Sequence, residues 1–327
     1  MNVFNLIDSY VHKHRLLSQD RTIIVGLSGG PDSVFLLHYL LSKKNEYNLT
    51  IIAAHLNHEW RDSAQADADF CEQLCNRLQV PFVYAKLSEL NLTLKPSGSK
   101  EQDARHARRA FFEQLVAAYS ADTVALAHHK NDQEETFFIR LLRGASLSGL
   151  VGMRPYNAPY IRPLLCIDKQ DILSALAESN CTFAVDPTNE SSCFLRNRIR
   201  HTLIPALNNI DKRFSGSFMM TLERLQETEL FLMRLTEQHF AEIAQLIPKT
   251  NSHILNKERF LSLDPVLQYR LLVYWLSKER LPFPVTQAFF DEMLRFLKRT
   301  HNIPHLIHPS WHLIKTKAGF YVRKSTS

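Results

Sequence analysis

The sequence predicts an α/β protein, in which a doubly wound, mostly parallel sheet is followed by a second, smaller, mainly helical C-terminal domain. Up to about residue 200, short strand-like apolar runs alternate with helical patterns, and beyond that point helical spacing prevails. Strands that alternate with helices imply right-handed crossovers and a sheet covered on both faces. With 327 residues, of which 45% are hydrophobic and 22% charged, the chain can bury such a core.

The strands and helices of the first domain are expected in alternation. Short runs rich in Ile, Val and Leu predict the strands, and apolar residues at helical spacing predict the helices between them. The strands are expected at 22–27, 49–55, 81–86 and 122–127, and the helices at 34–43, 63–79, 100–119 and 132–143. The polar segment 92–100, which holds Pro96 and Gly98, is expected to be a mobile loop.

The second domain is expected to begin near residue 215, so that the two domains span 1–215 and 216–327. Apolar residues at helical spacing predict helices within 217–246, 267–278 and 285–299. The segment from Trp311 to Lys324 alternates in polarity around a Lys-Ala-Gly turn, which predicts a closing hairpin.

The charge of the chain indicates a polyanionic partner. The formal net charge is +6 and the pI is near 9.0. After Glu292 the sequence has no acidic residue, but it still has basic ones. They are Arg295, Lys298, Arg299, Lys315, Lys317, Arg323 and Lys324. Such a segment favours nucleic acid as the partner, with a solvated basic tail as the alternative.

Composition argues against several other classes of protein. No run of 18 apolar residues is present, so neither a membrane-spanning helix nor a membrane partner is expected. The first residues include acidic and polar side chains and lack a signal-peptide core. The five cysteines are odd in number and scattered, which is typical of reduced thiols in a cytoplasmic protein. No protein partner is inferred.

The segment Ser28-Gly29-Gly30-Pro31-Asp32-Ser33 lies between the first predicted strand and the first predicted helix. Glycines let the backbone pass close to a ligand, and the following helix offers unpaired N–H groups and the positive end of its dipole. With the hydroxyls of Ser28 and Ser33, these groups make an anion nest suited to phosphate. A tight turn capped by Ser28 or Asp32 is the alternative.

Asp32 and Asp132 are candidate ligands of Mg²⁺. A carboxylate beside a phosphate nest is repelled unless a divalent cation binds both groups, which is why Asp32 predicts this ion. Asp132 follows the fourth strand and the pair His128-His129, a spacing that resembles metal ligation but is not the HExxH pattern of zinc sites. For each aspartate, a plain helix-capping role is the alternative.

His55 and Asn57 lie at the carboxyl end of the second strand, where open α/β sheets bind ligands. Asn57 can hydrogen-bond the edge of a base, with an ordinary loop asparagine as the alternative. Arg105 and Arg108 share one face of a predicted helix and can clamp phosphates, unless they pair with acids on the same surface.

Arg196, Arg198 and Arg200 form a basic run near the domain boundary, with Lys212 and Arg213 close by. Such a run can follow the backbone of an RNA. The alternative is a solvated start of a helix.

These segments together carry a family resemblance. The hexapeptide 28–33 matches, residue for residue, the pyrophosphate-binding loop of the N-type ATP pyrophosphatases, which share an adenine nucleotide α-hydrolase-like fold. Further segments resemble one family of that superfamily, the tRNA(Ile)-lysidine synthases. They are residues 55–58, 101–112, 127–136 with 141–144 and 149–153, 162–165, 186–189, and 194–200 with 203–205. The resemblance is dense from residue 22 to about 207 and weaker in the C-terminal third.

The resemblance implies a two-step reaction. ATP adenylates the 2-carbonyl oxygen of the wobble cytidine in a tRNA(Ile) with a CAU anticodon. Free L-lysine then attacks carbon 2, AMP leaves, and the product lysidine changes decoding from AUG to AUA. ATP and Mg²⁺ are therefore expected at the loop, and residues 216–327 are expected to bind the tRNA.

The resemblance also assigns roles to residues of this sequence. The catalytic residues are expected to be Asp32, Asp132, Arg105 and His129, with Asp32 and Asp132 as the metal ligands. The residues expected at ATP are Ser28, Gly29, Gly30, Pro31, Asp32, Ser33, His55 and Asn57, and those at tRNA are Arg108, Arg196, Arg198 and Arg200. Asp32, Asp132 or His129 is expected to accept the proton of the lysine amine, and the choice stays open. Three residues, Arg109, Asn131 and Phe194, depart from the family pattern; Asn131 stands where many members have an aspartate, so the acid role falls on Asp132.

Two other functions are weighed against this one. Another PP-loop tRNA-modifying enzyme, such as a 2-thiolation ATP pyrophosphatase, would need a pair of catalytic cysteines, and the sequence has no CxxC. A nucleotide-gated RNA-binding protein without catalysis would not need the intact loop together with both aspartates.

Overall fold

The computed structural model describes residues 3–60, 64–90, 100–184, 195–248, 252–300 and 303–325. The chain forms two compact units, Met1–Leu225 and Gln226–Ser327. The boundary expected near residue 215 falls at the start of helix α10 (Phe214–Ile243), whereas the two units divide within that helix. The loop expected at 92–100 lies outside the described residues up to residue 99.

The first unit is built on a six-stranded sheet, and its strands are parallel except for the last one. In spatial order the strands are β3 (Phe82–Lys86), β2 (Thr50–Asn57), β1 (Thr22–Gly26), β4 (Thr123–Ala125), β6 (Tyr160–Ile161) and β5 (Tyr156–Asn157). Val25 of β1 lies opposite Ala53 on one side and Ala125 on the other. This arrangement confirms the predicted mostly parallel sheet.

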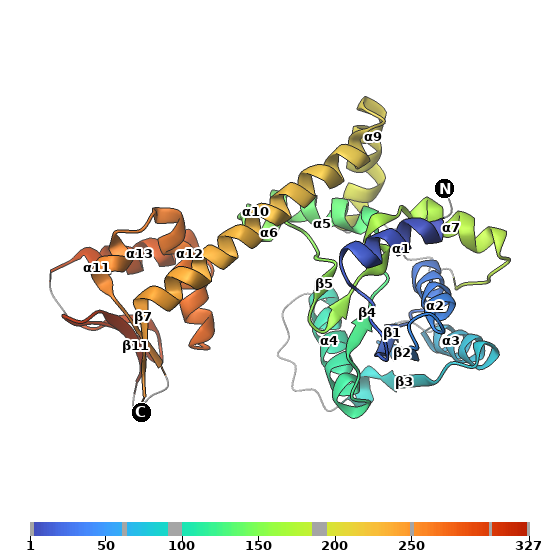
Figure 1. Ribbon diagram of the computed structural model, residues 1–327, viewed down its shortest axis with the longest axis horizontal. Coiled ribbons are helices and arrows are strands. Elements are labelled where there is room, and N and C mark those ends of the chain that lie inside the picture. The colour runs from blue at the N-terminus through green and yellow to red at the C-terminus, as the bar shows by residue number, and fades with distance from the viewer. Residues whose placement is uncertain are drawn as a thin grey trace. The chain divides into compact units, whose positions relative to one another are not determined.

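Helices cover both faces of this sheet, as Figure 1 shows. Because successive residues of a strand point to opposite faces, Ile23 and Val25 pack on one side and Ile24 on the other. The first face is covered by α1 (Val3–Lys13), α2 (Pro31–Lys43), α3 (Ala64–Leu78) and α7 (Lys169–Glu178). The other face packs against Phe111 and Phe112 of α4 (Lys100–Ala118).

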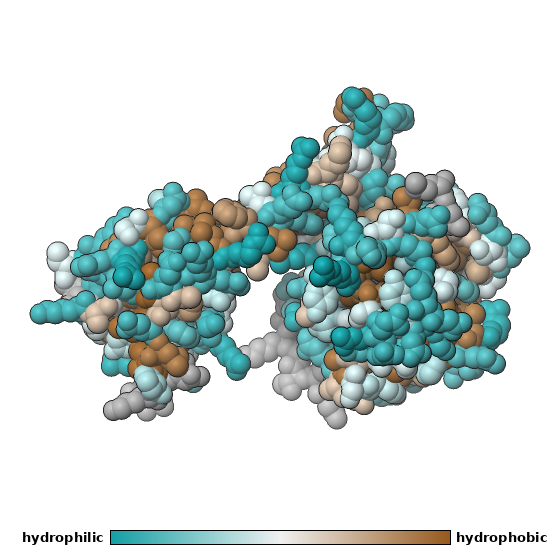
Figure 2. Space-filling model, in the orientation of Figure 1, coloured by the Kyte–Doolittle hydropathy of each residue, from teal (hydrophilic) through white to brown (hydrophobic). Residues whose placement is uncertain are grey.

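The remaining helices and turns of the first unit follow β4 in the sequence. They are α5 (Lys130–Leu142), α6 (Leu147–Leu150), a 3₁₀ turn at Pro163–Cys166, α8 (Leu195–Arg198), a π-helical turn at Ile199–Leu203 and α9 (Ile204–Ile210). A short 3₁₀ turn, Leu87–Glu89, follows β3. In the space-filling view, hydrophilic residues dominate the surface over α2 and α3, whose apolar residues lie in the core (Figure 2).

The second unit has helices and a five-stranded antiparallel sheet. The strands lie in the order β7 (Ala244–Ile247), β8 (Ser252–Leu255), β11 (Phe320–Lys324), β10 (Trp311–Lys315) and β9 (His305–His308). The helices are the C-terminal part of α10, α11 (Lys257–Leu261), α12 (Pro265–Lys278) and α13 (Gln287–Lys298). Trp275 and Phe320 are fully buried at the centre and meet edge to face, with ring centroids 5.3 Å apart.

The closing hairpin is present as β10 and β11, but the sheet around it was not predicted. The helix expected to run through residue 246 ends at Ile243, because Ala244 begins the strand that pairs with β8. Within the described residues, none of the helices is both long and apolar enough to span a membrane.

Candidate active site

The glycine-rich loop closes tightly at the carboxyl end of β1. Gly29 has a φ of +85°, and a Cβ at this position would lie 3.3 Å from Sγ of Cys71, so the loop needs glycine there. Ser33 Oγ accepts the N–H of Ser28 at 3.1 Å and donates to the carbonyl of Gly30 at 2.9 Å. These bonds hold the loop in front of the first turn of α2, whose N–H groups face an incoming anion.

Asp32 stands in the first turn of α2, at the rim of this loop. Its Oδ1 accepts a hydrogen bond from Nζ of Lys169 at 2.5 Å, and it lies 3.9 Å from Nε2 of His129. Lys169 is the first residue of α7, and His129 precedes α5. Three loops that are distant in sequence therefore meet at Asp32.

His129 and Asp132 form the second part of the site. Asp132 Oδ2 accepts the backbone N–H of His129 at 3.0 Å and lies 3.5 Å from Nε2 of the same residue, while Oδ1 binds Nη2 of Arg196 at 2.9 Å. Burial opposes the ionisation of Asp132, but its neighbours His129, His128 and Arg196, together with the hydrogen bond from the N–H of His129, outweigh it and lower the pKa of the carboxyl. Asp132 therefore caps α5 and presents an ionised carboxylate toward the loop.

Glu135 anchors two of the arginines that were predicted to bind tRNA. It is fully buried, and it accepts Nε of Arg196 at 2.6 Å and Nε of Arg200 at 2.5 Å. Both guanidinium groups are thus paired with a buried carboxylate, although their side chains are 26% and 36% exposed, whereas Arg198 lies exposed on the same turn. Of the predicted basic run, Arg198 has the surface position that an RNA backbone requires.

His55 and Asn57 lie at the carboxyl end of β2, beside the loop. Nδ1 of His55 donates to the carbonyl of Leu27 at 2.9 Å, which ties β2 to the start of the loop. Burial lowers the pKa of His55, so its imidazole is neutral at pH 7. Asn57 uses its side chain locally, since Oδ1 accepts the N–H of Glu59 at 2.8 Å and Nδ2 donates to Tyr84 Oη at 3.2 Å.

Arg105 lies exposed on α4 and is the centre of a group of positive charges. Desolvation and then the charge of Arg105 lower the pKa values of Arg108, Arg140 and Arg162. Arg108 also contacts Nε2 of His58 at 3.4 Å. A cluster of guanidinium groups that repel one another is suited to a polyanion, which relieves the repulsion.

Several buried nitrogen atoms near this cluster have no hydrogen-bonding partner within the part of the chain that the structure describes. They are Nδ1 of His58, Nδ1 of His128, Nδ1 of His129 and Nε of Arg162. Burial lowers the pKa of His128 to about 4, so its imidazole is neutral. Buried polar atoms are rarely left unpaired, so these atoms indicate a place for bound groups.

The donor set at the loop fits Mg²⁺ better than zinc. Asp32 and Asp132 offer carboxylate oxygens on either side of His129, and Mg²⁺ is typically held by one or two carboxylates together with substrate phosphates. Within the described ranges, no three His, Cys, Asp or Glu side chains gather as a metal centre by themselves.

The structure thus brings most of the predicted site residues together at the carboxyl edge of the sheet, with His55 and Asn57 beside them. The residues brought together are Ser28, Gly29, Gly30, Pro31, Asp32, Ser33, His129 and Asp132. Arg105 and Arg108 lie on α4, outside these direct contacts. Glu135 was noted in the sequence only for a metal-like spacing with His128, His129 and Asp132, and Arg162 only as part of the segment 162–165. Nothing in the local sequence marked Lys169, which lies 137 residues from Asp32.

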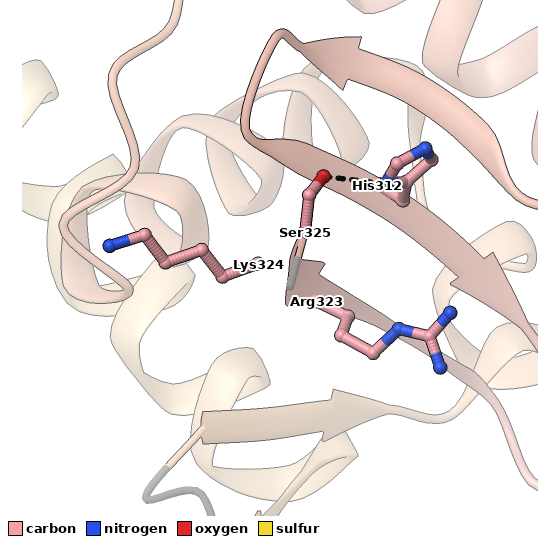
Figure 3. A pocket seen from close by; sticks show the side chains of 4 residues that line it. All are labelled: His312, Arg323, Lys324 and Ser325. Carbon is pink, nitrogen blue, oxygen red and sulfur yellow. Dashed lines mark hydrogen bonds between the residues drawn. The ribbon is translucent and has the colours of Figure 1, made fainter. Parts of the chain in front are cut away.

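The second unit carries a separate basic surface. His312, Arg323, Lys324 and Ser325 line a shallow hollow, with Nδ1 of His312 3.2 Å from Oγ of Ser325 (Figure 3). Arg323 and Lys324 are exposed at the end of β11. In contrast, Lys315 is buried and donates to the carbonyls of Phe296 and Arg299 at the end of α13. Lys315 therefore stabilises the fold, and Arg323 and Lys324 remain available to an anionic partner.

Comparison with known proteins gives a consistent result. Residues 4–207 match the PP-loop domain family. The chain is similar to the tRNA(Ile)-lysidine synthase of Bacillus cereus (strain ATCC 14579), with 33% identity over 303 residues that cover 90% of this chain and 63% of that protein. It is also similar to the tRNA(Ile)-lysidine synthase of Geobacter sulfurreducens, with 38% identity over 239 residues, 72% of this chain and 50% of the relative. The chain thus spans less than two thirds of the length of these relatives.

Among solved structures, the U34-tRNA thiolase NcsA from Methanococcus maripaludis with its [4Fe-4S] cluster has a similar fold. Its TM-score is 0.58 at 18% sequence identity, and the match covers 68% of this chain and 78% of that one. At this identity the likeness concerns the fold alone.

Proposed function

The chain belongs to the PP-loop domain family, and on that premise we propose that it is a tRNA(Ile)-lysidine synthase. It ligates free L-lysine to carbon 2 of the wobble cytidine of tRNA(Ile) with a CAU anticodon, and it consumes ATP to AMP and diphosphate. The observation that carries the proposal is the meeting of the Ser28–Ser33 loop with Asp32, His129 and Asp132. The similarity to lysidine synthases over 90% of the chain supports it.

The chemistry explains why ATP is needed. The 2-carbonyl oxygen of cytidine is a poor leaving group, whereas AMP is a good one, so adenylation must precede the attack of the amine. In the first step the carbonyl oxygen attacks the α-phosphorus and the bond to the bridging oxygen breaks, with pyrophosphate as the leaving group. The loop N–H groups and the hydroxyls of Ser28 and Ser33 bind the phosphate oxygens on which negative charge develops.

Arg105 and its neighbouring guanidinium groups bind the polyanionic reactants in this proposal. Desolvation, and after it the charge of Arg105, lowers the pKa values of Arg108 and Arg162, and phosphates that lie between these groups would stabilise their charged forms. Arg198, Arg323 and Lys324 are exposed and bind the tRNA backbone. Arg196 and Arg200 act mainly by holding Asp132 and Glu135 in place.

The lysine amine must be neutral before it attacks carbon 2. With a reference pKa near 10.4, its deprotonation at pH 7 costs roughly 4.6 kcal/mol, so a base or a desolvating pocket is required. His129 faces both Asp32 and Asp132, so a proton taken at Nε2 of His129 is stabilised by two carboxylates. We assign the base to His129 for this reason, and Asp132 to the orientation of its ring.

Asp32 and Asp132 would hold Mg²⁺, which neutralises charge on the triphosphate when it is bound. Because the proposed substrates are ATP, lysine and a tRNA, we place the protein in the cytoplasm.

Thiolation is the less favoured alternative. Burial raises the pKa values of Cys71 and Cys166 to about 12 and that of Cys75 to about 11, so these thiols stay protonated and unreactive at pH 7. A sulfur-transfer enzyme needs a reactive thiolate.

The release of pyrophosphate distinguishes the candidate functions. The protein is incubated with ATP and tRNA(Ile), with either lysine or a sulfide donor. Turnover that requires lysine supports the lysidine synthase, turnover that requires the sulfur donor supports the thiolase, and binding of ATP without turnover supports a non-catalytic RNA-binding protein.

A further inference from the structure

We propose that the side chain of Lys169 is the cationic group that binds the triphosphate of ATP. The phosphate loop contains no lysine and cannot supply such a group itself. The inference rests on the proposed function. In the structure the Nζ of Lys169 is bound to Asp32 at 2.5 Å, at the rim of the phosphate loop. Lys169 thus places a positive charge at the phosphate-binding loop, although it belongs to helix α7, which lies far from this loop in the sequence.

Hydrogen bonds fix the backbone of Lys169 next to the site. Its N–H donates to Oδ1 of Asn131 at 2.9 Å. Next to it, Nζ of Lys130 lies 3.3 Å from Oδ2 of Asp168, and the N–H of Lys130 donates to the carbonyl of Ile167 at 3.0 Å. The start of α7 is therefore tied to the start of α5, next to His129 and Asp132.

The groups that the loop itself offers to phosphate are neutral. They are backbone N–H groups and the hydroxyls of Ser28 and Ser33, which also bond to each other at 3.1 Å. Asp32 is negative, so without a cation the loop would repel a triphosphate. The ammonium group of Lys169 removes this repulsion.

The pair between Lys169 and Asp32 is weak enough to be exchanged. The two side chains are 35% and 28% exposed, and ion pairs between partly exposed side chains contribute little to stability because water screens them. If Asp32 were to hold a divalent cation, the ammonium group of Lys169 would be free to bind the triphosphate. The contact seen in the free protein is thus the resting position of a phosphate ligand.

In the adenylation step, Lys169 forms no covalent bond and transfers no proton. The cytidine oxygen bonds to the α-phosphorus, the bond from this phosphorus to the bridging oxygen breaks, and the electron pair leaves with pyrophosphate. Lys169 stabilises the negative charge that builds on these oxygens.

The test compares Lys169→Met with Lys169→Arg, and it uses Lys43→Met as a matched control. Lys43 makes a similar ion pair with Asp8, at 2.6 Å, but at the opposite end of α2. Two quantities are measured: the kcat and KM of pyrophosphate release with ATP, lysine and tRNA(Ile), and the Kd of α,β-methylene-ATP with magnesium by calorimetry.

We expect Lys169→Met to lower kcat by about a hundredfold and to weaken binding of the analogue by about tenfold. Lys169→Arg should recover most of both, and Lys43→Met should match the wild type. Unchanged kcat and unchanged Kd in Lys169→Met would overturn the inference, and so would an equal loss in Lys43→Met. If the wild type released no pyrophosphate with tRNA and lysine, the proposed function would fail, and the Kd of the analogue would still decide the role of Lys169.

Discussion

The carboxylate of Asp32 faces Nε2 of His129 at 3.9 Å, although one residue follows β1 and the other follows β4. The contact exists because β1 and β4 are neighbouring parallel strands whose carboxyl ends open at the same edge of the sheet. The phosphate loop thereby lies next to His129 and Asp132, which follow it by about a hundred residues in the sequence.

Replacement of Asp32 by alanine should abolish adenylation and leave tRNA binding within a fewfold of the wild type. The carboxylate is expected to bind the cation that neutralises the triphosphate, and loss of one such electrostatic group costs about a hundredfold or more in rate. The measurement is lysidine formation together with a tRNA-binding titration. Asp211→Asn, which removes an exposed acid paired with Arg213, is the control and should behave as the wild type. Retained lysidine formation in Asp32→Ala would refute the assignment.

Glu135→Gln should destabilise the first unit strongly. The buried carboxylate binds both Arg196 and Arg200, so removing its charge weakens the pairing of both guanidinium groups, of which Arg196 also binds Asp132. Breaking a buried ion pair in this way costs about 3–5 kcal/mol in the free energy of unfolding. Urea unfolding measures the effect. Glu113→Gln is the matched control, because Glu113 pairs with Arg109 on the surface, and its loss should stay below about 0.5 kcal/mol. Similar effects of the two substitutions would contradict the structural role of Glu135.

The stability of the protein should fall in acid partly because of His58. Burial and the charge of Arg108 lower the pKa of His58 to about 4, below the 6.5 of a free histidine. Between these pH values the unfolded chain binds a proton that the folded chain excludes, so the free energy of unfolding decreases as the pH drops from 6.5 to 4.

The substitution His58→Gln tests this linkage. In that variant the decrease in the free energy of unfolding between pH 6.5 and pH 4 should be smaller than in the wild type, as measured by urea unfolding at each pH. His12→Gln, at an exposed position, should keep the wild-type slope. An unchanged slope in His58→Gln would show that this histidine titrates normally in the folded chain.

The double substitution Arg323→Gln with Lys324→Gln should weaken tRNA binding and make it less sensitive to salt. Each phosphate contact contributes about 0.7–0.9 to the slope of log K against log salt, so loss of both contacts should reduce this slope by about 1.5. The readout is a tRNA-binding titration at several salt concentrations, with Lys44→Gln, at the exposed residue that follows α2, as the control. If the slope did not change, the end of β11 would have no part in RNA binding.

The alternating elements of the first unit could be predicted from the sequence because their apolar runs are long and buried. The strand expected at 22–27 is Thr22–Gly26, and the helix expected at 63–79 is Ala64–Leu78. The two-residue strands β5 and β6 and the strand β7 were not predicted. Such short segments have no periodicity of their own, and pairing with a neighbour defines them.

The loops of the candidate site could be predicted from the sequence, but the contacts between their side chains could not. The loop 28–33 and Asp132 were visible as motifs, whereas Lys169 reaches Asp32 only through the packing of α7. The arginines at 196 and 200 look like RNA ligands in the sequence, because charge alone does not reveal that a buried Glu135 lies beneath them.

The central claim is that the loop 28–33 directs ATP to an oxygen of RNA so that lysine can be joined to the base. Mass analysis of the wobble nucleoside, after incubation of the protein with ATP, lysine, magnesium and CAU-anticodon tRNA(Ile), tests it most directly. We expect cytidine to be converted to lysidine, with AMP and pyrophosphate formed in equal amounts. An unmodified cytidine, or cleavage of ATP only at its terminal phosphate, would contradict the claim.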